Sequence, residues 1–275
     1  MSVIIRSETI SRWMGQSNTF EKIKAINGKV VRAKEGRKTQ RFEIDGQGFY
    51  CKYHGGIGWK EIVKNLLQLK LPVVGASNEW LAINRLHKLN LDTLSAVAYG
   101  KQGINPARQE SFLVTEELTG TLSLAVFAEQ WPQTPPPFAL KKALIEKVAN
   151  IAGDIHRHGI NHRDLYICHF LLDIAAGEQN INAEAVRLFL VDLHRAQIRS
   201  KVPDRWLVKD VGSIYFSAMD VGLTRRDIYR FIKAYTQQPL REALSEHTAF
   251  WQRVRQRATR LYIRDWKRPP VEVFD

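Results

Sequence analysis

A proline-rich stretch separates two parts of the chain that differ in hydrophobic periodicity. The stretch runs from Trp131 to Pro137 as WPQTPPP, and no helix or strand can span it, because proline fixes φ and lacks an N–H. Before it, short apolar runs dominate; after it, apolar residues recur mainly at the helical period. The pattern predicts a strand-rich first part followed by a larger, mostly helical part.

In the first part, strands are predicted over residues 30–32, 40–44, 49–53, 97–99 and 112–115. The second and third of these are joined by the hairpin sequence Asp45-Gly46-Gln47-Gly48. Apolar residues at helical spacing predict helices over 59–67 and 78–89.

In the second part, a long amphipathic helix is predicted over 140–158, ending at Gly159. Two apolar runs, 170–172 and 188–191, are expected to pair as a hairpin with a long loop. Helices follow from Trp206 onward, and one of them is expected to begin with a capping box from Thr224 to Asp227.

Composition limits the class of protein. At 275 residues and 44% hydrophobic content, the chain can bury a sizeable core. Its two cysteines, Cys51 and Cys168, cannot form a disulfide framework, so a reduced compartment is expected. No apolar run reaches the roughly 18–20 residues that cross a bilayer, and the first residues lack a signal-peptide core. We therefore expect a cytoplasmic protein.

The net charge of +13 points to an anionic partner. The basic residues gather in three regions, 32–41, 199–209 and 253–268. Charge alone leaves four partners open: nucleic acid, an anionic membrane, a phosphorylated substrate or an acidic protein.

The most specific chemistry lies between Asn161 and Leu172. This segment begins just after the predicted helix end and carries His162-Arg163-Asp164 at its start. Such a triplet before a strand is typical of the catalytic loop of protein kinases, where the aspartate accepts the proton of the attacking hydroxyl. A residue five positions later reaches Mg²⁺ in those enzymes. Because three residues recur by chance, the triplet needs support from the rest of the chain.

That support comes from groups that follow one another in the order a kinase requires. Lys52 lies on a predicted strand, where it can neutralise phosphates, and Glu79 opens a predicted helix, where it can hold that lysine. Asp192 follows a predicted strand as a candidate Mg²⁺ ligand. Glu117 and Leu118 lie where a hinge between lobes would offer its backbone to adenine.

Each residue also has a simpler interpretation. Lys52 could be an edge-strand charge, Glu79 a helix N-terminal acid, and Asp192 a turn cap. Five of the eight histidines lie between residues 156 and 194, but their spacing is not that of a zinc site. The sequences typical of P-loop and Rossmann nucleotide sites are absent.

The chain closely resembles the lipopolysaccharide core heptose kinases of Gram-negative bacteria, the WaaP group. The segments that carry the resemblance are residues 60–67, 79–80, 162–172, 191–197, 215–217 and 222–228. It implies an α+β, bilobal protein-kinase-like fold, with a small strand-rich N-lobe (1–117) and a larger helical C-lobe (118–275). It also implies a phosphotransferase with an alcohol group as acceptor, using ATP and Mg²⁺ to phosphorylate the first heptose of the inner core.

By position, the resemblance makes Asp164 the catalytic base, Lys52 with Glu79 the phosphate-binding pair, and Asp192 a metal ligand. His169 stands where protein kinases have an asparagine ligand, but imidazole is a poor ligand for Mg²⁺, so orienting Asp164 or touching a phosphate is an alternative. The glycine-rich loop is reduced to one glycine, Gly36, among basic residues.

Asp210, just ahead of an apolar helix, is a further candidate, for a buried acid that braces the catalytic loop.

The implied acceptor is a lipid-anchored saccharide, which places the protein peripherally at the cytoplasmic face of the inner membrane. An acidic protein such as acyl carrier protein is a further expected partner, and nucleic acid is not expected. Alternatives remain: another core sugar or a protein hydroxyl as acceptor, a catalytically silent kinase-fold scaffold, or a nucleic-acid-binding protein.

Overall fold

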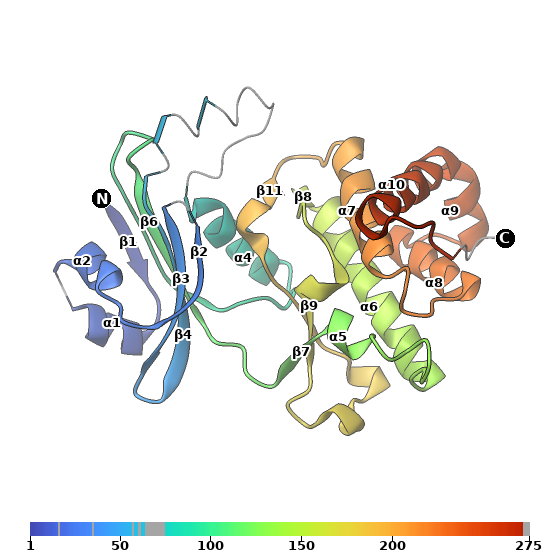
Figure 1. Ribbon diagram of the computed structural model, residues 1–275, viewed down its shortest axis with the longest axis horizontal. Coiled ribbons are helices and arrows are strands. Elements are labelled where there is room, and N and C mark those ends of the chain that lie inside the picture. The colour runs from blue at the N-terminus through green and yellow to red at the C-terminus, as the bar shows by residue number, and fades with distance from the viewer. Residues whose placement is uncertain (16, 35, 57, 60–61, 64–74, 272–275) are drawn as a thin grey trace. The chain divides into compact units, whose positions relative to one another are not determined.

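The computed structural model describes residues 1–15, 17–34, 36–56, 58–59, 62–63 and 75–271 (Figure 1). The chain forms two compact units. The first comprises residues 1–89, 93–118 and 193–195, and the second comprises residues 90–92, 119–192 and 196–275.

The first unit is built on an antiparallel six-stranded sheet with the order β1-β5-β6-β4-β3-β2. Its strands are β1 (Ser2–Ile5), β2 (Lys29–Lys34), β3 (Arg37–Ile44), β4 (Gln47–His54), β5 (Ala96–Gln102) and β6 (Glu110–Glu116). Its helices are α1 (Glu8–Met14), α2 (Thr19–Lys24) and α4 (Ser77–Lys88). The strands predicted in this part and the helix predicted over 78–89 are confirmed. Most of the helix predicted over 59–67 lies outside the described residues.

The core of the first unit explains where Lys52 points. Ile10, Met14 and Ile23 of α1 and α2 pack with Phe49 and Cys51 of β4 in one buried cluster. Lys52 follows Cys51 in β4, and successive side chains of a strand alternate between its two faces. The side chain of Lys52 therefore projects from the face opposite this cluster.

β1, α1 and α2 were not predicted. Each is between four and seven residues long, too short for a hydrophobic period to be visible. One local signal was present, because the Ser7 side chain caps α1 by accepting a hydrogen bond from the backbone N–H of Ile10 at 3.4 Å.

The second unit is mostly helical. Its helices are α5 (Leu124–Phe127), α6 (Phe138–Arg157), α7 (Asp204–Ser217), α8 (Arg225–Thr236), α9 (Leu240–Glu246) and α10 (Thr248–Trp266). Two small antiparallel sheets accompany them: β7 (Thr121–Ser123) with β9 (Phe170–Asp173) and β10 (Leu188–Leu190), and β8 (Ile160–Asn161) with β11 (Gln197–Ile198). The predicted hairpin is confirmed as β9 and β10, and the predicted long helix as α6.

The capping box of α8 is confirmed. The Thr224 hydroxyl accepts a hydrogen bond from the Asp227 N–H at 3.3 Å, and the Asp227 carboxylate accepts one from the Thr224 N–H at 2.9 Å. Aspartate therefore replaces the usual glutamate of this motif.

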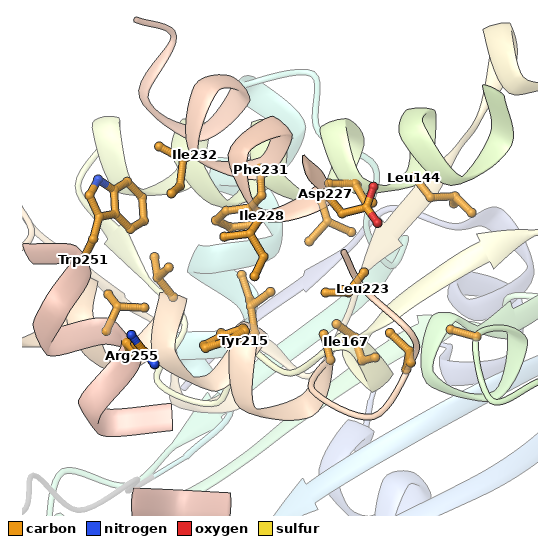
Figure 2. Close-up of a pocket in the computed structure, with 18 of the residues that line it drawn as sticks. Leu144, Ile167, Tyr215, Leu223, Asp227, Ile228, Phe231, Ile232, Trp251 and Arg255 are labelled. Atoms are coloured by element: carbon orange, nitrogen blue, oxygen red, sulfur yellow. The ribbon is translucent and has the colours of Figure 1, made fainter. Parts of the chain in front are cut away.

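Helices α6, α7, α8 and α10 contribute to the lining of a partly open apolar cavity of about 280 Å³ (Figure 2). Its wall includes Leu144, Tyr215, Ile228, Phe231 and Trp251. Among the residues that the structure describes, no helix combines the length and the apolar character needed to cross a bilayer.

Candidate active site

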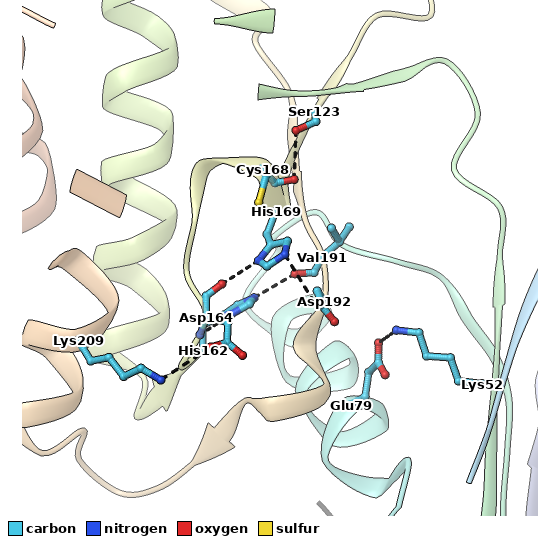
Figure 3. A network of polar contacts seen from close by, with 10 residues as sticks. All are labelled: Lys52, Glu79, Ser123, His162, Asp164, Cys168, His169, Val191, Asp192 and Lys209. Carbon is cyan, nitrogen blue, oxygen red and sulfur yellow. Dashed lines mark hydrogen bonds and ion pairs between the residues drawn. The ribbon is translucent and has the colours of Figure 1, made fainter. Parts of the chain in front are cut away.

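Lys52 and Glu79 form an ion pair within the first unit (Figure 3). The Nζ atom of Lys52 on β4 lies 2.5 Å from Oε1 of Glu79, which stands in the first turn of α4. Glu79 is 1% exposed, so its charge has little solvation other than this contact. The pair therefore fixes the position of the lysine ammonium.

The loop that carries Asp164 is held by a buried carboxylate in the second unit. Asp210 accepts hydrogen bonds from the backbone N–H groups of His162, at 2.6 Å, and Arg163, at 2.8 Å. It is fully buried and also lies 3.4 Å from Nε2 of His156. The predicted bracing role of Asp210 is confirmed, although the residue lies within α7 rather than ahead of it.

His162 joins this loop to the strand that precedes Asp192. Its Nε2–H donates to the Val191 carbonyl at 3.0 Å, and its Nδ1 accepts a longer hydrogen bond, 3.4 Å, from the Asp164 N–H. Both contacts require the neutral Nε2–H tautomer, and burial lowers the pKa of this imidazole accordingly. His162 is thus a fixed structural link.

His169 lies between Asp164 and Asp192. Its Nδ1–H donates to the Asp164 carbonyl at 2.7 Å, and its Nε2 lies 3.5 Å from Oδ2 of Asp192 (Figure 3). Burial disfavours the imidazolium, but hydrogen bonds to the Cys168 side chain and the Asp164 carbonyl, together with the Asp192 charge, raise the pKa of His169 to about 9. His169 therefore connects the two aspartates.

The backbone departs from its ordinary conformations at two of these positions. Arg163 has a φ of 75° and Asp192 a φ of 64°. Non-glycine residues in the left-handed region cost on the order of 1–3 kcal/mol and gather at functional sites. At Arg163, the hydrogen bond from the backbone N–H to Asp210 holds this conformation in place.

Lys209, also on α7, was not singled out from the sequence. Its Nζ lies 3.8 Å from Oδ1 of Asp164 (Figure 3). The sequence placed it in the basic region 199–209 but not beside Asp164, because a contact between residues so far apart in the chain leaves no local pattern.

The segment predicted as a hinge is anchored to the first unit. The Glu117 carboxylate accepts two hydrogen bonds from Arg41, at 2.8 and 2.7 Å, and one from the Tyr50 hydroxyl, at 3.2 Å. The backbone N–H of Glu117 donates to the Gly48 carbonyl at 2.9 Å. The single-glycine stretch lies at the turn between β2 and β3, where Gly36 has a φ of 72°.

The structure thus joins the candidate residues in two sets. Lys52 and Glu79 meet in the first unit, where Glu117 and Leu118 also belong. Asp164, His169 and Asp192 meet in the second.

Comparison with known proteins identifies the family. Residues 21–235 match the family model described as lipopolysaccharide kinase (Kdo/WaaP) family. The lipopolysaccharide core heptose(I) kinase WaaP of Pseudomonas aeruginosa is 50% identical over 261 residues, covering 95% of this chain and 96% of the relative. The Escherichia coli protein of the same name is 44% identical over 249 residues, covering 90% and 92%.

A solved structure described as WaaP in complex with acyl carrier protein superposes with a TM-score of 0.83. It is 44% identical to this chain and covers 95% of it and 100% of the other chain. The resemblance, the α+β protein-kinase-like fold and the phosphotransferase class predicted from the sequence are confirmed. The chain belongs to the lipopolysaccharide kinase (Kdo/WaaP) family.

Proposed function

We propose that this chain transfers the γ-phosphoryl group of ATP to a hydroxyl of the first heptose of the lipopolysaccharide inner core, with Asp164 as general base. The names of its relatives support the acceptor. The role of Asp164 as the base is supported by the hydrogen bonds that hold the backbone of its loop, which involve Asp210 and His169. A base that removes a hydroxyl proton must be held in position relative to its substrate.

The nucleotide is proposed to bind to residues of the N-lobe, 1–117, and to Leu118, the first residue of the C-lobe. Lys52, positioned by Glu79, would neutralise the phosphates. Because the Glu117 N–H already donates to Gly48, we propose that adenine contacts the backbone of Leu118, with Glu117 fixing the segment through Arg41. The C-lobe, 118–275, would supply the base and hold the acceptor.

The residues present fit one Mg²⁺ ion. The side chain of Asp192 is 32% exposed, and Mg²⁺ in phosphoryl-transfer sites takes one or two carboxylates and completes its shell with phosphate and water oxygens. Among the described residues, no group of three or more His, Cys, Asp and Glu side chains could hold a metal ion. Bound to Asp192, the ion would neutralise charge on the β- and γ-phosphates.

His169 is proposed as a positioning residue rather than a metal ligand. Its Nδ1–H is committed to the Asp164 carbonyl, and its Nε2 faces the Asp192 carboxylate. With a proton on each ring nitrogen, the imidazolium satisfies the contacts with both Asp164 and Asp192, and it has no lone pair left for a metal ion. The metal role predicted for His169 from the sequence is therefore not part of this proposal.

In the reaction, Asp164 accepts the proton of the heptose hydroxyl as the oxygen attacks the γ-phosphorus and the bond to ADP breaks. Lys52 stabilises charge on the phosphates. These groups contribute position and electrostatic stabilisation, which are the main sources of catalysis in phosphoryl transfer.

The test is phosphate transfer from γ-labelled ATP to two purified acceptors that differ only in the presence of the heptose. Label should enter the heptose-bearing lipopolysaccharide and not the heptose-free form. Label in both acceptors, or in protein alone, would favour another core sugar or a protein hydroxyl as acceptor.

We also propose that acyl carrier protein binds this chain, as it binds the related WaaP in the solved complex. Arg253 and Arg260 on α10 are exposed and suit an acidic partner, and the apolar cavity suits its acyl chain. Acylated carrier protein should bind at least about tenfold tighter than the unacylated form, and Leu223→Trp, which narrows the cavity, should remove that difference. Equal binding of both forms to the unaltered chain would refute the use of the cavity.

A peripheral location at the cytoplasmic face of the inner membrane is proposed from the end of α10. Ile263 and Trp266 are 46% and 58% exposed there, close to the basic Arg264, Lys267 and Arg268. Exposed apolar and basic residues together favour an anionic membrane interface. Sedimentation with anionic vesicles should weaken in Trp266→Ala, and binding that ignores lipid charge would count against the proposal.

A further inference from the structure

Four cationic side chains surround the indole of Trp206 in the second unit. The guanidinium carbons of Arg163, Arg199 and Arg205 lie 5.1, 5.9 and 5.5 Å from the ring centroid, and Nζ of Lys209 lies 5.5 Å from it. We call these residues the Trp206 cluster. They come from the catalytic loop, from the segment after β11 and from the first turns of α7.

Lys209 of the Trp206 cluster is paired with Asp164, but Arg199 and Arg205 are placed differently. Arg199 donates to the neutral amide oxygen of Gln197. Within the part of the chain that the structure describes, neither Arg199 nor Arg205 has a carboxylate at ion-pair distance, and the nearby Asp204 pairs with Arg253. Positive charges gathered around one indole repel one another, and contact with the ring offsets only part of this repulsion. An oxyanion bound among these cations would remove the repulsion.

The cluster lies beside the proposed base. Lys209 contacts both the Trp206 ring and the Asp164 carboxylate, from which its Nζ is 3.8 Å away. Arg163 is 7% exposed and serves to hold the indole, whereas Arg205 is exposed and Arg199 half-buried. Arg199, Arg205 and Lys209 therefore present charge to a ligand within reach of Asp164.

We propose that Arg199, Arg205 and Lys209 form a subsite for an acidic group of the saccharide acceptor, either a sugar carboxylate or a phosphate. This inference rests on the proposed function, because it takes the acceptor of Asp164 to be lipopolysaccharide core. Guanidinium groups bind both oxyanions through paired, charge-assisted hydrogen bonds. Anchoring the acidic group there sets a neighbouring hydroxyl against Asp164 and leaves ATP binding to other residues.

The test compares the unaltered enzyme with the double variant Arg199→Gln/Arg205→Gln. Arg241→Gln on α9 is the control, since it loses an exposed charge outside the Trp206 cluster. Steady-state transfer is measured with separate titrations of ATP and acceptor, and acceptor binding is measured without ATP. The acceptor is a deacylated core oligosaccharide, offered intact, carboxyl-reduced or phosphatase-treated.

The double variant should raise the acceptor KM and the acceptor Kd at least about tenfold and leave the ATP KM within about twofold. The unaltered enzyme should lose a similar factor with whichever modified acceptor lacks the recognised group, so the two modifications identify the carboxylate or the phosphate. The double variant should no longer distinguish that acceptor from the intact one.

An acceptor Kd within about twofold of the unaltered enzyme, or an equal loss in Arg241→Gln, would overturn the subsite. A rise in the ATP KM alone would overturn it too, by assigning the cluster to the nucleotide. Absence of transfer by the unaltered enzyme would instead refute the proposed function, while the binding measurements still decide whether the subsite exists.

Discussion

The carboxylate of Asp210 accepts a hydrogen bond from the backbone N–H of Arg163 at 2.8 Å, at a residue whose φ is 75°. A buried acid thus stabilises a strained turn directly before the proposed base. Asp210→Asn keeps the shape of the side chain, but its amide NH₂ group cannot accept a hydrogen bond. This group would face the backbone N–H of either His162 or Arg163. We expect the substitution to lower the free energy of unfolding by about 2–4 kcal/mol, measured by urea denaturation. Asp204→Asn, exposed on the same helix, should have a much smaller effect.

The pairing of Lys52 with Glu79 predicts non-additive stability. Lys52→Met leaves a buried carboxylate without its cation, whereas the same change in a Glu79→Gln background does not. A double-mutant cycle should therefore give a coupling energy of about 1–3 kcal/mol. A coupling near zero would show that the pair is not formed in solution.

The entrance to the catalytic loop depends on a glycine. Gly159 has a φ of 77°, and a Cβ there would lie 1.9 Å from the Arg199 carbonyl oxygen. Gly46 has the same φ with open space around it, which makes it a matched control. Gly46→Ala should cost about 1–2 kcal/mol, and Gly159→Ala at least about 1–3 kcal/mol more. Equal costs would contradict the close packing of this loop.

The capping box predicts a pH dependence of stability. Burial raises the pKa of Asp227, but hydrogen bonds from Thr224 and the ion pair with Lys141 outweigh burial and lower it below its usual value. A lowered folded-state pKa stabilises the fold above the unfolded-state pKa, near 3.9, and this stability is lost as the pH falls through the folded-state pKa. Asp227→Asn should therefore be less stable than the unaltered chain at pH 7, with the difference shrinking below about pH 4 in thermal melts. A difference that is constant with pH would rule this linkage out.

Sequence patterns predicted the helices and strands that are long enough to show a hydrophobic period. They also predicted the charged residues that follow one another in the order a kinase requires. The pairing of Lys52 with Glu79 was predicted in this way, and Asp210 was placed correctly as the brace. The short N-terminal elements were missed, because four to seven residues show no period. The Lys209–Asp164 contact was missed because it depends on how α7 packs against the loop.

The most direct test of the account is the rate of phosphate transfer from labelled ATP to heptose-bearing core lipopolysaccharide by Asp164→Asn, measured in single turnover with both substrates saturating. If Asp164 is the base, this rate should fall by about 10²–10⁴, while nucleotide binding and the melting temperature stay close to those of the unaltered enzyme. Transfer at the unaltered rate would contradict the role of Asp164.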